Sequence, residues 1–290
     1  MYISVIVPFY NAEHYLEACI QSLRTQTLDR HRFEIIFVNN GSSDRSCDIV
    51  RQYPDLQLLH EKKPGSYAAR NCGLRVARGE IVAFTDADCV VAKDWLSRIE
   101  DGMQRTRSAL VLGKRLFPPH VSNWLRIFQH YENAKVSYVV GLKLRPYFFG
   151  FTNNMAVQRE VFDRVGMFRE WKRAADTEFV QRCIAHDPAI AISYLPEVQI
   201  THLEITTVTK WLCKMGLYGE SNERVRRLFN YRKLKWKDNW QIICSCVEEI
   251  RTSIPHMIPV LLLMALSDVA YRFGVLKGML CVWMPFRRAT

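Results

Sequence analysis

The chain has 290 residues and a mass of 33.9 kDa, a size that suits one large domain or two small ones. With 49% hydrophobic and 24% charged residues it can form a core, which excludes low-complexity, collagen-like and disordered classes. The net charge is +11, and residues 205–290 supply +8 of it, with 14 basic and 6 acidic side chains. The composition therefore predicts a nearly neutral globular part followed by a basic one.

Residues 1–8 lack the basic start, long apolar stretch and cleavage site of a signal peptide, so we expect the first strand there. Nine cysteines without C-x-x-C spacing favour reduced thiols and a cytoplasmic location. The segment that comes nearest to a membrane span, 257–266, is too short for one. We expect it to be a core, re-entrant or interfacial segment.

The first hundred residues alternate between strand and helix periodicity. We expect strands at 3–8, 34–38, 56–60 and 80–85, and helices at 12–25, 44–53 and 66–76. Further strands are expected at 108–115, 153–157 and within 189–202, with helices at 123–134, from 159, at 176–185 and after 205. This pattern predicts an α/β fold with a Rossmann-type, mostly parallel central sheet flanked by helices, and a helical C-terminal extension.

Three of the expected strands end in polar clusters, at 8–11, 39–44 and 86–88. In open α/β sheets, ligands bind beyond the carboxyl ends of the strands. Asp86 and Asp88 follow an apolar run, and because side chains alternate along a strand, we expect both carboxylates on one side of it. Hard oxygen ligands at this spacing suit Mg²⁺ or Mn²⁺ shared with substrate phosphates. The sequence therefore predicts a metal site at this edge of the sheet.

Four segments, in order, resemble the opening of family 2 glycosyltransferases with the GT-A fold. They are Val5-Ile-Val-Pro-Phe-Tyr-Asn11, Glu34-Ile-Ile-Phe-Val-Asn-Asn-Gly-Ser-Ser-Asp44, Ala68-Ala-Arg-Asn-Cys-Gly-Leu74 and Gly79-Glu-Ile-Val-Ala-Phe-Thr-Asp-Ala-Asp88. The resemblance covers about 1–205, which we expect to be the catalytic domain, with 206–290 as a basic, amphipathic helical C-terminal region.

The resemblance implies a donor site for a nucleotide-diphosphate sugar. Pro8 and Tyr10 match the loop over which the nucleotide base packs. Asn40 stands where the family commonly carries an Asp that contacts the base, and Asn39-Asn40 replaces the usual acidic pair. An amide adds a donor to the acceptor, so uridine is only the default base. Arg70 resembles the arginine that reaches toward the nucleotide or the metal-binding carboxylates, the alternative being a surface arginine on a helix.

The metal site implied by the resemblance holds Mn²⁺ or Mg²⁺. Asp86 and Asp88 match its carboxylates, with Asp86 also on the diphosphate side. The cation would neutralise charge on the departing nucleotide diphosphate. His202 follows a strand at the place where many relatives carry a further metal-associated histidine, and a satisfied structural histidine is the alternative.

Attack by an acceptor hydroxyl needs a base to remove its proton. The segment from Trp171 to Arg182 resembles the family's Glu-Asp-x-Asp/Glu-Leu motif, with Asp176 in the base position and Ala175 in place of the usual Glu. A plain helix N-cap is the alternative for Asp176, and we expect Glu178 to supply helix N-terminal charge. Asn153 and Asn154 match the strand that lines the acceptor side.

The basic part of the chain is densest at 224–237, which holds seven basic residues and no acidic one, with three aromatic residues interleaved. Such a segment suits an anionic membrane surface, nucleic acid or a solvated helix face. The apolar helices that follow favour the membrane surface over nucleic acid. We also expect Asp268 and Arg272, four residues apart, to pair on one helix face.

The sequence therefore predicts a metal-dependent, inverting glycosyltransferase acting on a glycan or lipid-linked acceptor in polysaccharide or glycolipid biosynthesis, at the inner face of the cell membrane. Processive relatives carry Gln-x-x-Arg-Trp after the base, and this motif is not in the sequence, which favours the addition of one or a few sugars. Two alternatives stay open: a nucleotidyltransferase on a similar sheet, and a degenerate sugar-nucleotide or membrane-binding adaptor.

Overall fold

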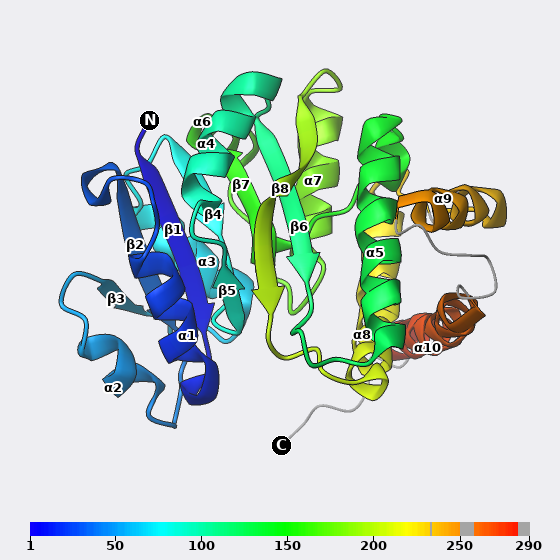
Figure 1. Cartoon of the computed structure of the whole chain (residues 1–290), viewed down its shortest axis with the longest axis horizontal. Coiled ribbons are helices and arrows are strands. Elements are labelled where there is room, and N and C mark those ends of the chain that lie inside the picture. Colours follow the sequence, from blue (N-terminus) through cyan, green and yellow to red (C-terminus); the bar gives the residue numbers. More distant parts are fainter. Residues whose placement is uncertain (233, 250–257, 284–290) are drawn as a thin grey trace.

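The computed structural model describes residues 1–232, 234–249 and 258–283. An eight-stranded mixed sheet in the order β3-β2-β1-β4-β7-β6-β8-β5 forms its centre (Figure 1). The strands are β1 (Ile3–Phe9), β2 (Phe33–Asn39), β3 (Gln57–His60), β4 (Ile81–Phe84), β5 (Cys89–Val91), β6 (Leu110–Leu116), β7 (Met155–Gln158) and β8 (Ile192–His202). Four of the seven pairings are parallel, and each antiparallel one involves β5 or β7.

Helices cover both faces of the sheet, because β1, β2 and β4 are buried along their whole length and need apolar cover on each side. The first face carries α1 (Glu13–Arg24), α2 (Ser46–Arg51) and α4 (Trp95–Thr106). The second carries α3 (Ser66–Val76), α6 (Arg159–Val165) and α7 (Ala175–His186). The expected α/β architecture is confirmed.

Most of the expected elements are present, and the differences have local causes. Two elements have no counterpart among the expected ones: β5, which has only three residues, and α4. The buried side chains of α4 include Trp95, Ile99 and Met103 at helical spacing, so this helix did have a sequence signal. The helix expected at 123–134 continues to Gly141 as α5 (Asn123–Gly141).

The C-terminal helices lie at the end of the molecule away from β3, beside α5 (Figure 1). They are α8 (Val208–Leu228), α9 (Trp236–Glu249) and α10 (Ile258–Trp283). These helices and α5 share a separate core, in which Phe128 packs edge to face on Trp211 with ring centroids 5.1 Å apart. The predicted boundary at 205/206 therefore separates segments that pack together, and the division into two domains stays a prediction.

The apolar segment 258–266 is the first part of α10 and not a short isolated run, while Met257 lies outside the described residues. The expected pair on this helix is confirmed, with Arg272 Nε 2.6 Å from Asp268 Oδ2. No described helix combines the length and apolar composition that crossing a membrane requires.

The backbones of α8 and α10 approach closely at three glycines. A Cβ added at Gly274 would overlap the carbonyl oxygen of Gly216, and one at Gly219 would overlap that of Tyr271. Glycine is needed at such positions because any side chain would push the two helices apart. This contact fixes α8, which carries Lys214 to the candidate site.

Candidate functional site

The polar segments after β1 and β2 meet at one edge of the sheet, as the sequence predicts. The backbone N–H of Asn11 donates to Ser42 Oγ (3.0 Å), and that of Ser43 donates to Asn11 Oδ1 (2.9 Å). Pro8 is buried within β1, whereas Tyr10 just beyond the strand is 64% exposed. Of the two residues expected to pack against a nucleotide base, Tyr10 therefore offers the open aromatic face.

The side chain of Asn40 is committed to the loop that precedes α3. Its Nδ2 donates to the carbonyl oxygens of Glu61 (3.0 Å) and Lys63 (2.8 Å), and its Oδ1 accepts from the backbone N–H of Gly65 (2.6 Å). A carboxylate could not make the two donor contacts. The structure thus gives a local reason for an amide at this position, and in this arrangement Asn40 has no N–H left for a nucleotide base.

Arg70 lies on α3 and is only 2% exposed, so it is not a surface arginine. Its guanidinium donates to the carboxylate of Asp86, which is one-third exposed, and lies 5.3 Å from the centroid of the Tyr67 ring. The Nε of Arg70 is buried and has no hydrogen-bond partner. The buried guanidinium of Arg70 therefore lies beside the partly exposed carboxylate of Asp86.

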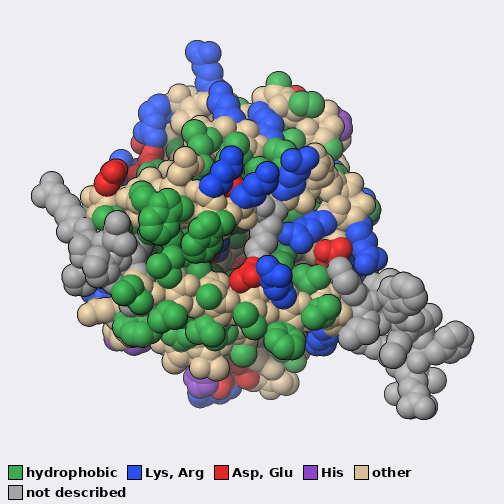
Figure 2. All heavy atoms as spheres, turned by 90° about the vertical axis from the view of Figure 1, so that its right-hand side faces the viewer, with side chains coloured by type: hydrophobic (Ala, Val, Ile, Leu, Met, Phe, Trp, Pro, Cys, Tyr) green, Lys and Arg blue, Asp and Glu red, His purple; other side chains and the backbone are tan. Residues whose placement is uncertain are grey.

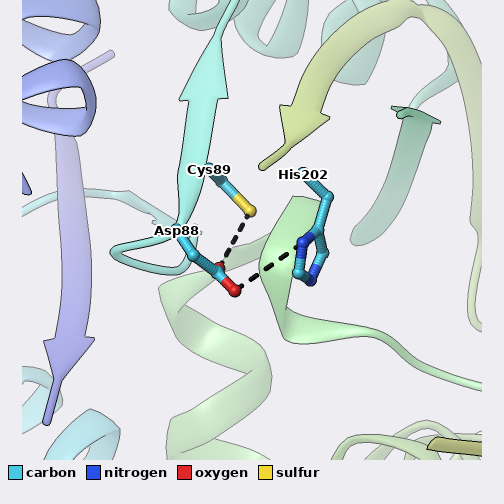
Figure 3. Close-up of side chains that lie close together, drawn as sticks. All are labelled: Asp88, Cys89 and His202. Carbon is cyan, nitrogen blue, oxygen red and sulfur yellow. Dashed lines mark hydrogen bonds and ion pairs between the residues drawn. The ribbon is translucent and has the colours of Figure 1, made fainter. Parts of the chain in front are cut away.

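Asp88, Cys89 and His202 form a cluster that is suited to hold a cation (Figure 3). Antiparallel pairing of β5 with β8 sets Cys89 opposite His202, and the Asp88 carboxylate turns toward the ring, with Oδ2 3.6 Å from Nδ1. The three ligand atoms lie within 4.8 Å of one another. The pairing of two strands distant in sequence therefore assembles this cluster.

The sequence predicts that Asp86 and Asp88 project from one side of a strand. This is wrong, because neither residue lies in a strand. The strand β4 ends at Phe84, and both aspartates belong to the turn before β5, where side-chain alternation does not apply. In this turn Asp86 contacts Arg70 and Asp88 faces His202. The two carboxylates thus have separate partners.

Burial shifts the pKa values of all three groups in this cluster, and it raises that of the Asp88 carboxylate. Burial, followed by the nearby positive charge of Lys214, lowers the pKa of His202 to about 3, so its ring is neutral, as a metal ligand must be. Its Nδ1 is buried without a hydrogen-bond partner. Because the Lys214 ammonium can only donate to Nε2, Nδ1 carries the ring proton in this arrangement, and the ring must change tautomer to bind a cation through Nδ1. Burial raises the pKa of the Cys89 thiol, which donates to Asp88 Oδ1 at 3.6 Å and is not a thiolate ligand. The carboxylate suits Mn²⁺ or Mg²⁺, and an imidazole ligand favours the transition metal Mn²⁺ of the two.

Lys214 of α8 reaches this cluster, although it is not among the site residues that the sequence predicts. Its Nζ lies 3.3 Å from His202 Nε2 and 2.7 Å from Glu204 Oε2. The Lys214 side chain is mostly buried, so water screens its positive charge only weakly and the charge interacts more strongly with its neighbours. A lysine twelve residues after the histidine, on a different element, has no sequence pattern that links it to the site.

Asp176 is the second residue of α7 and does not cap it, because Ala174 is the N-cap residue. Its carboxylate accepts from the backbone N–H of Thr177 (2.8 Å) and from the hydroxyl of Tyr67 on α3. Burial raises the pKa of Asp176, and these two hydrogen bonds act in the opposite direction. A Cβ at Gly150 would lie 2.5 Å from the Asp176 carbonyl oxygen, so glycine allows this close approach. A partly exposed carboxylate of raised pKa suits a base.

Glu178 has a structural role that differs from the expected one. Its side chain is fully buried, and its Oε1 lies 2.9 Å from the Nε atoms of both Arg169 and Arg182. The residue is in the first turn of α7, but its charge compensates two guanidinium groups. Glu178 therefore joins α7 to the loop after α6.

The two asparagines expected on the acceptor side differ in availability. Asn154 is 1% exposed; it accepts from Trp95 Nε1 (2.9 Å) and donates to the carbonyl oxygens of Lys114 and Val198. Its amide joins α4, β6 and β8 and is not available to an acceptor sugar. Asn153 is partly exposed, and its Oδ1 has no hydrogen-bond partner. Asn153 is thus the better candidate.

Comparison with known sequences identifies glycosyltransferases as relatives. The family model described as Glycosyl transferase family 2 matches residues 4–178. Glycosyltransferase AglE of Haloferax volcanii is 31% identical over 202 residues, which is 64% of this chain and 65% of that one. The putative glycosyltransferase EpsH of Bacillus subtilis is 40% identical over 101 residues, covering 33% and 29% of the two chains. The chain thus spans less than two thirds of the length of either relative.

Solved structures share the fold. The mannosyltransferase PcManGT from Pyrobaculum calidifontis, in complex with GDP-Man and Mn²⁺, superposes with a TM-score of 0.62 at 20% identity, covering 98% of this chain and 76% of that one. TarS residues 1–349 from S. aureus, in complex with UDP-GlcNAc, gives 0.55 at 22% identity, covering 85% and 72%. At these identities the likeness establishes the GT-A type of fold.

Proposed function

The chain belongs to glycosyl transferase family 2, and we propose that it transfers a sugar from a nucleotide-diphosphate donor to an acceptor hydroxyl in glycan biosynthesis. The observation that carries this proposal is the facing pair of Asp88 and His202, whose buried Nδ1 has no hydrogen-bond partner, at the edge of the sheet where the β1 and β2 loops meet. A neutral imidazole and a carboxylate so placed fit a divalent cation that binds a diphosphate.

The donor would lie along this edge. Tyr10 offers an exposed ring to the nucleotide base, and the guanidinium of Arg70 would orient the diphosphate from beside Asp86. Structures that share the fold were solved with UDP-GlcNAc and with GDP-Man and Mn²⁺, which supports a nucleotide sugar and a divalent cation. Uridine remains our default base, although the engagement of Asn40 leaves the base contact to other groups.

When bound by Asp88 and His202, the cation would supply Lewis-acid stabilisation of the departing diphosphate. Asp176 takes the proton from the acceptor hydroxyl at its carboxylate. The acceptor oxygen then bonds to the anomeric carbon while the bond from that carbon to the diphosphate oxygen breaks. Attack opposite the leaving group inverts the anomeric configuration, and each cycle adds one sugar. Asn153 is our candidate for orienting the acceptor.

The test begins with a thermal-shift screen of nucleotide sugars with Mn²⁺, since a ligand of the folded state raises its apparent stability. Binding of Mn²⁺ and use of the selected donor are then measured for the wild type, Asp88→Asn and Asp94→Asn. Asp94 pairs with Arg98 on the surface and serves as the control. We expect Asp88→Asn to lose Mn²⁺ binding and turnover together and Asp94→Asn to keep both. Undiminished metal-dependent turnover in Asp88→Asn would overturn the assignment.

A further inference from the structure

The outer face of α10 is apolar and exposed over most of its length. Its exposed apolar residues are Ile258, Leu262, Leu266, Val269, Phe273 and Leu276. Their spacing of three or four residues places them in one stripe along the helix, about 27 Å long at 1.5 Å per residue. Phe273 is 70% exposed and the other five are each at least half exposed. We name these six residues the α10 stripe.

The α10 stripe is not the face by which the helix joins the rest of the protein. That face carries Val260 and Leu263, which are buried in the core shared with α5, α8 and α9. A surface helix normally has one apolar face and one polar face, whereas α10 is apolar on both. A contiguous apolar surface on a soluble protein marks an interaction site. The stripe therefore needs a partner.

The side chains exposed on the C-terminal helices indicate what that partner is. On α9, Trp236 and Trp240 are 66% and 41% exposed and four residues apart, which puts both rings on one side of that helix. The C-terminal part of the chain also carries exposed basic residues, which are Arg227, Arg232, Lys235, Lys237, Arg272 and Lys277. Figure 2 shows this end of the molecule, where hydrophobic side chains gather beside Lys and Arg and few acidic groups are visible.

We propose that the α10 stripe, with Trp236 and Trp240, docks on the surface of an anionic lipid bilayer, with α10 lying in the plane of the interface. Aliphatic and Phe side chains would enter the boundary between headgroups and acyl chains, indole rings suit the headgroup level, and the basic residues attract anionic lipid. A second copy of the chain is disfavoured as the partner, because the two basic regions, each with a net charge of +8 over 205–290, would face each other.

Vesicle co-sedimentation tests this proposal without any need for turnover, so its outcome is independent of the catalytic assignment. The full chain is mixed with vesicles of phosphatidylcholine alone or of phosphatidylcholine with phosphatidylglycerol. We expect binding to the anionic vesicles that weakens as salt is raised. The double variant Leu266→Glu/Phe273→Glu should reduce the bound fraction by at least about tenfold, because each residue loses an apolar contact and gains a repelled charge.

The matched control is Val76→Glu/Met167→Glu, which changes two exposed apolar residues outside the C-terminal helices by the same net charge. It should bind as the wild type does, and both variants should melt like the wild type because all four side chains are exposed. Equal loss of binding in the two variants would show a general charge effect and overturn the proposal. A wild-type dimer by light scattering that the α10 variant converts to a monomer, with no vesicle binding, would assign the stripe to a second copy instead.

Discussion

The ammonium group of Lys214 lies 3.3 Å from Nε2 of His202, on the side of the ring away from Asp88. The lysine belongs to α8 and the histidine to the end of β8, so the C-terminal helices contribute a charge to the candidate metal site. Close packing of α8 on α10 through glycines holds this charge in place.

We predict that Lys214→Met changes metal and donor binding in opposite directions. A fixed positive charge beside a cation site weakens divalent binding, so without nucleotide the variant should bind Mn²⁺ about threefold or more tightly. The same charge attracts a diphosphate, so the KM for the donor should rise. Titration calorimetry and initial rates measure the two effects, and Lys237→Met, an exposed lysine on α9, should change neither. Weaker Mn²⁺ binding in Lys214→Met would contradict this account.

The pH profile should report the hydrogen bond between Tyr67 and Asp176. The proposed base acts as a carboxylate, so kcat falls as the pH drops through its pKa, and burial places that pKa above the ordinary range for Asp. Tyr67→Phe removes a donor that stabilises the charged form, so the acid limb of kcat should move to still higher pH while the alkaline plateau is largely kept.

The control for this shift is Tyr53→Phe, since Tyr53 donates to the carboxylate of Glu17 on the surface at 2.6 Å. Its acid limb should coincide with that of the wild type. Asp176→Asn should keep donor binding and lose transfer. An unmoved acid limb in Tyr67→Phe, or a joint loss of binding and transfer in Asp176→Asn, would remove Asp176 from the role of base.

We predict that Asn40→Asp damages the chain although it restores the acidic residue usual in the family. The carboxylate would face the carbonyl oxygens of Glu61 and Lys63 with no proton to donate, at a cost of about 1–3 kcal/mol in the free energy of unfolding. Because this loop leads into α3, donor affinity should also fall.

Asn39→Asp is the matched comparison. Asn39 Nδ2 lies 3.3 Å from His60 Nδ1, and a histidine nitrogen can carry the proton and donate to a carboxylate. Urea unfolding should therefore rank Asn39→Asp close to the wild type and Asn40→Asp well below it. The reverse order would show that the amide of Asn40 is not what holds this loop.

Glu178→Gln should lower stability without moving the pH profile. Removing a buried charge leaves Arg169 and Arg182 without their shared partner, which costs about 3 kcal/mol. Glu160→Gln removes a largely exposed acid that pairs with Arg164, and should cost less than about 0.5 kcal/mol. Denaturant unfolding compares the two. If the acid limb of kcat shifted in Glu178→Gln as it does in Tyr67→Phe, Glu178 would belong to the proton-transfer machinery.

Much of the fold could be predicted from the sequence, because buried strands and amphipathic helices carry period-two and period-3.6 patterns in their own residues. The helix at 66–76 matches its expected bounds, and the polar loops after β1 and β2 meet as expected. The short strand β5 could not be predicted, because three residues are too few for a period to appear.

The family and the residue types of the site could be predicted without the structure, since both depend on local motifs such as Asp86-Ala87-Asp88. The partner of each residue depends on how the chain folds. In the folded protein Arg70 pairs with Asp86, His202 faces Asp88, and Tyr67 donates to Asp176. The side chains of Asn40 and Asn154 are used in hydrogen bonds within the protein and are not available to a substrate. These contacts join residues far apart in the chain, so no local spacing records them.

For the basic C-terminal region, too, the sequence and the structure answer different questions. The sequence located +8 of the +11 in its last 86 residues, but composition alone did not distinguish a lipid surface from a solvated helix face. The structure shows α10 with apolar residues on both its packed and its exposed faces, and this depends on which side α5 and α8 cover. Whether a residue is buried depends on which elements pack against it. A sequence pattern shows which residues could be buried, but not which of them are.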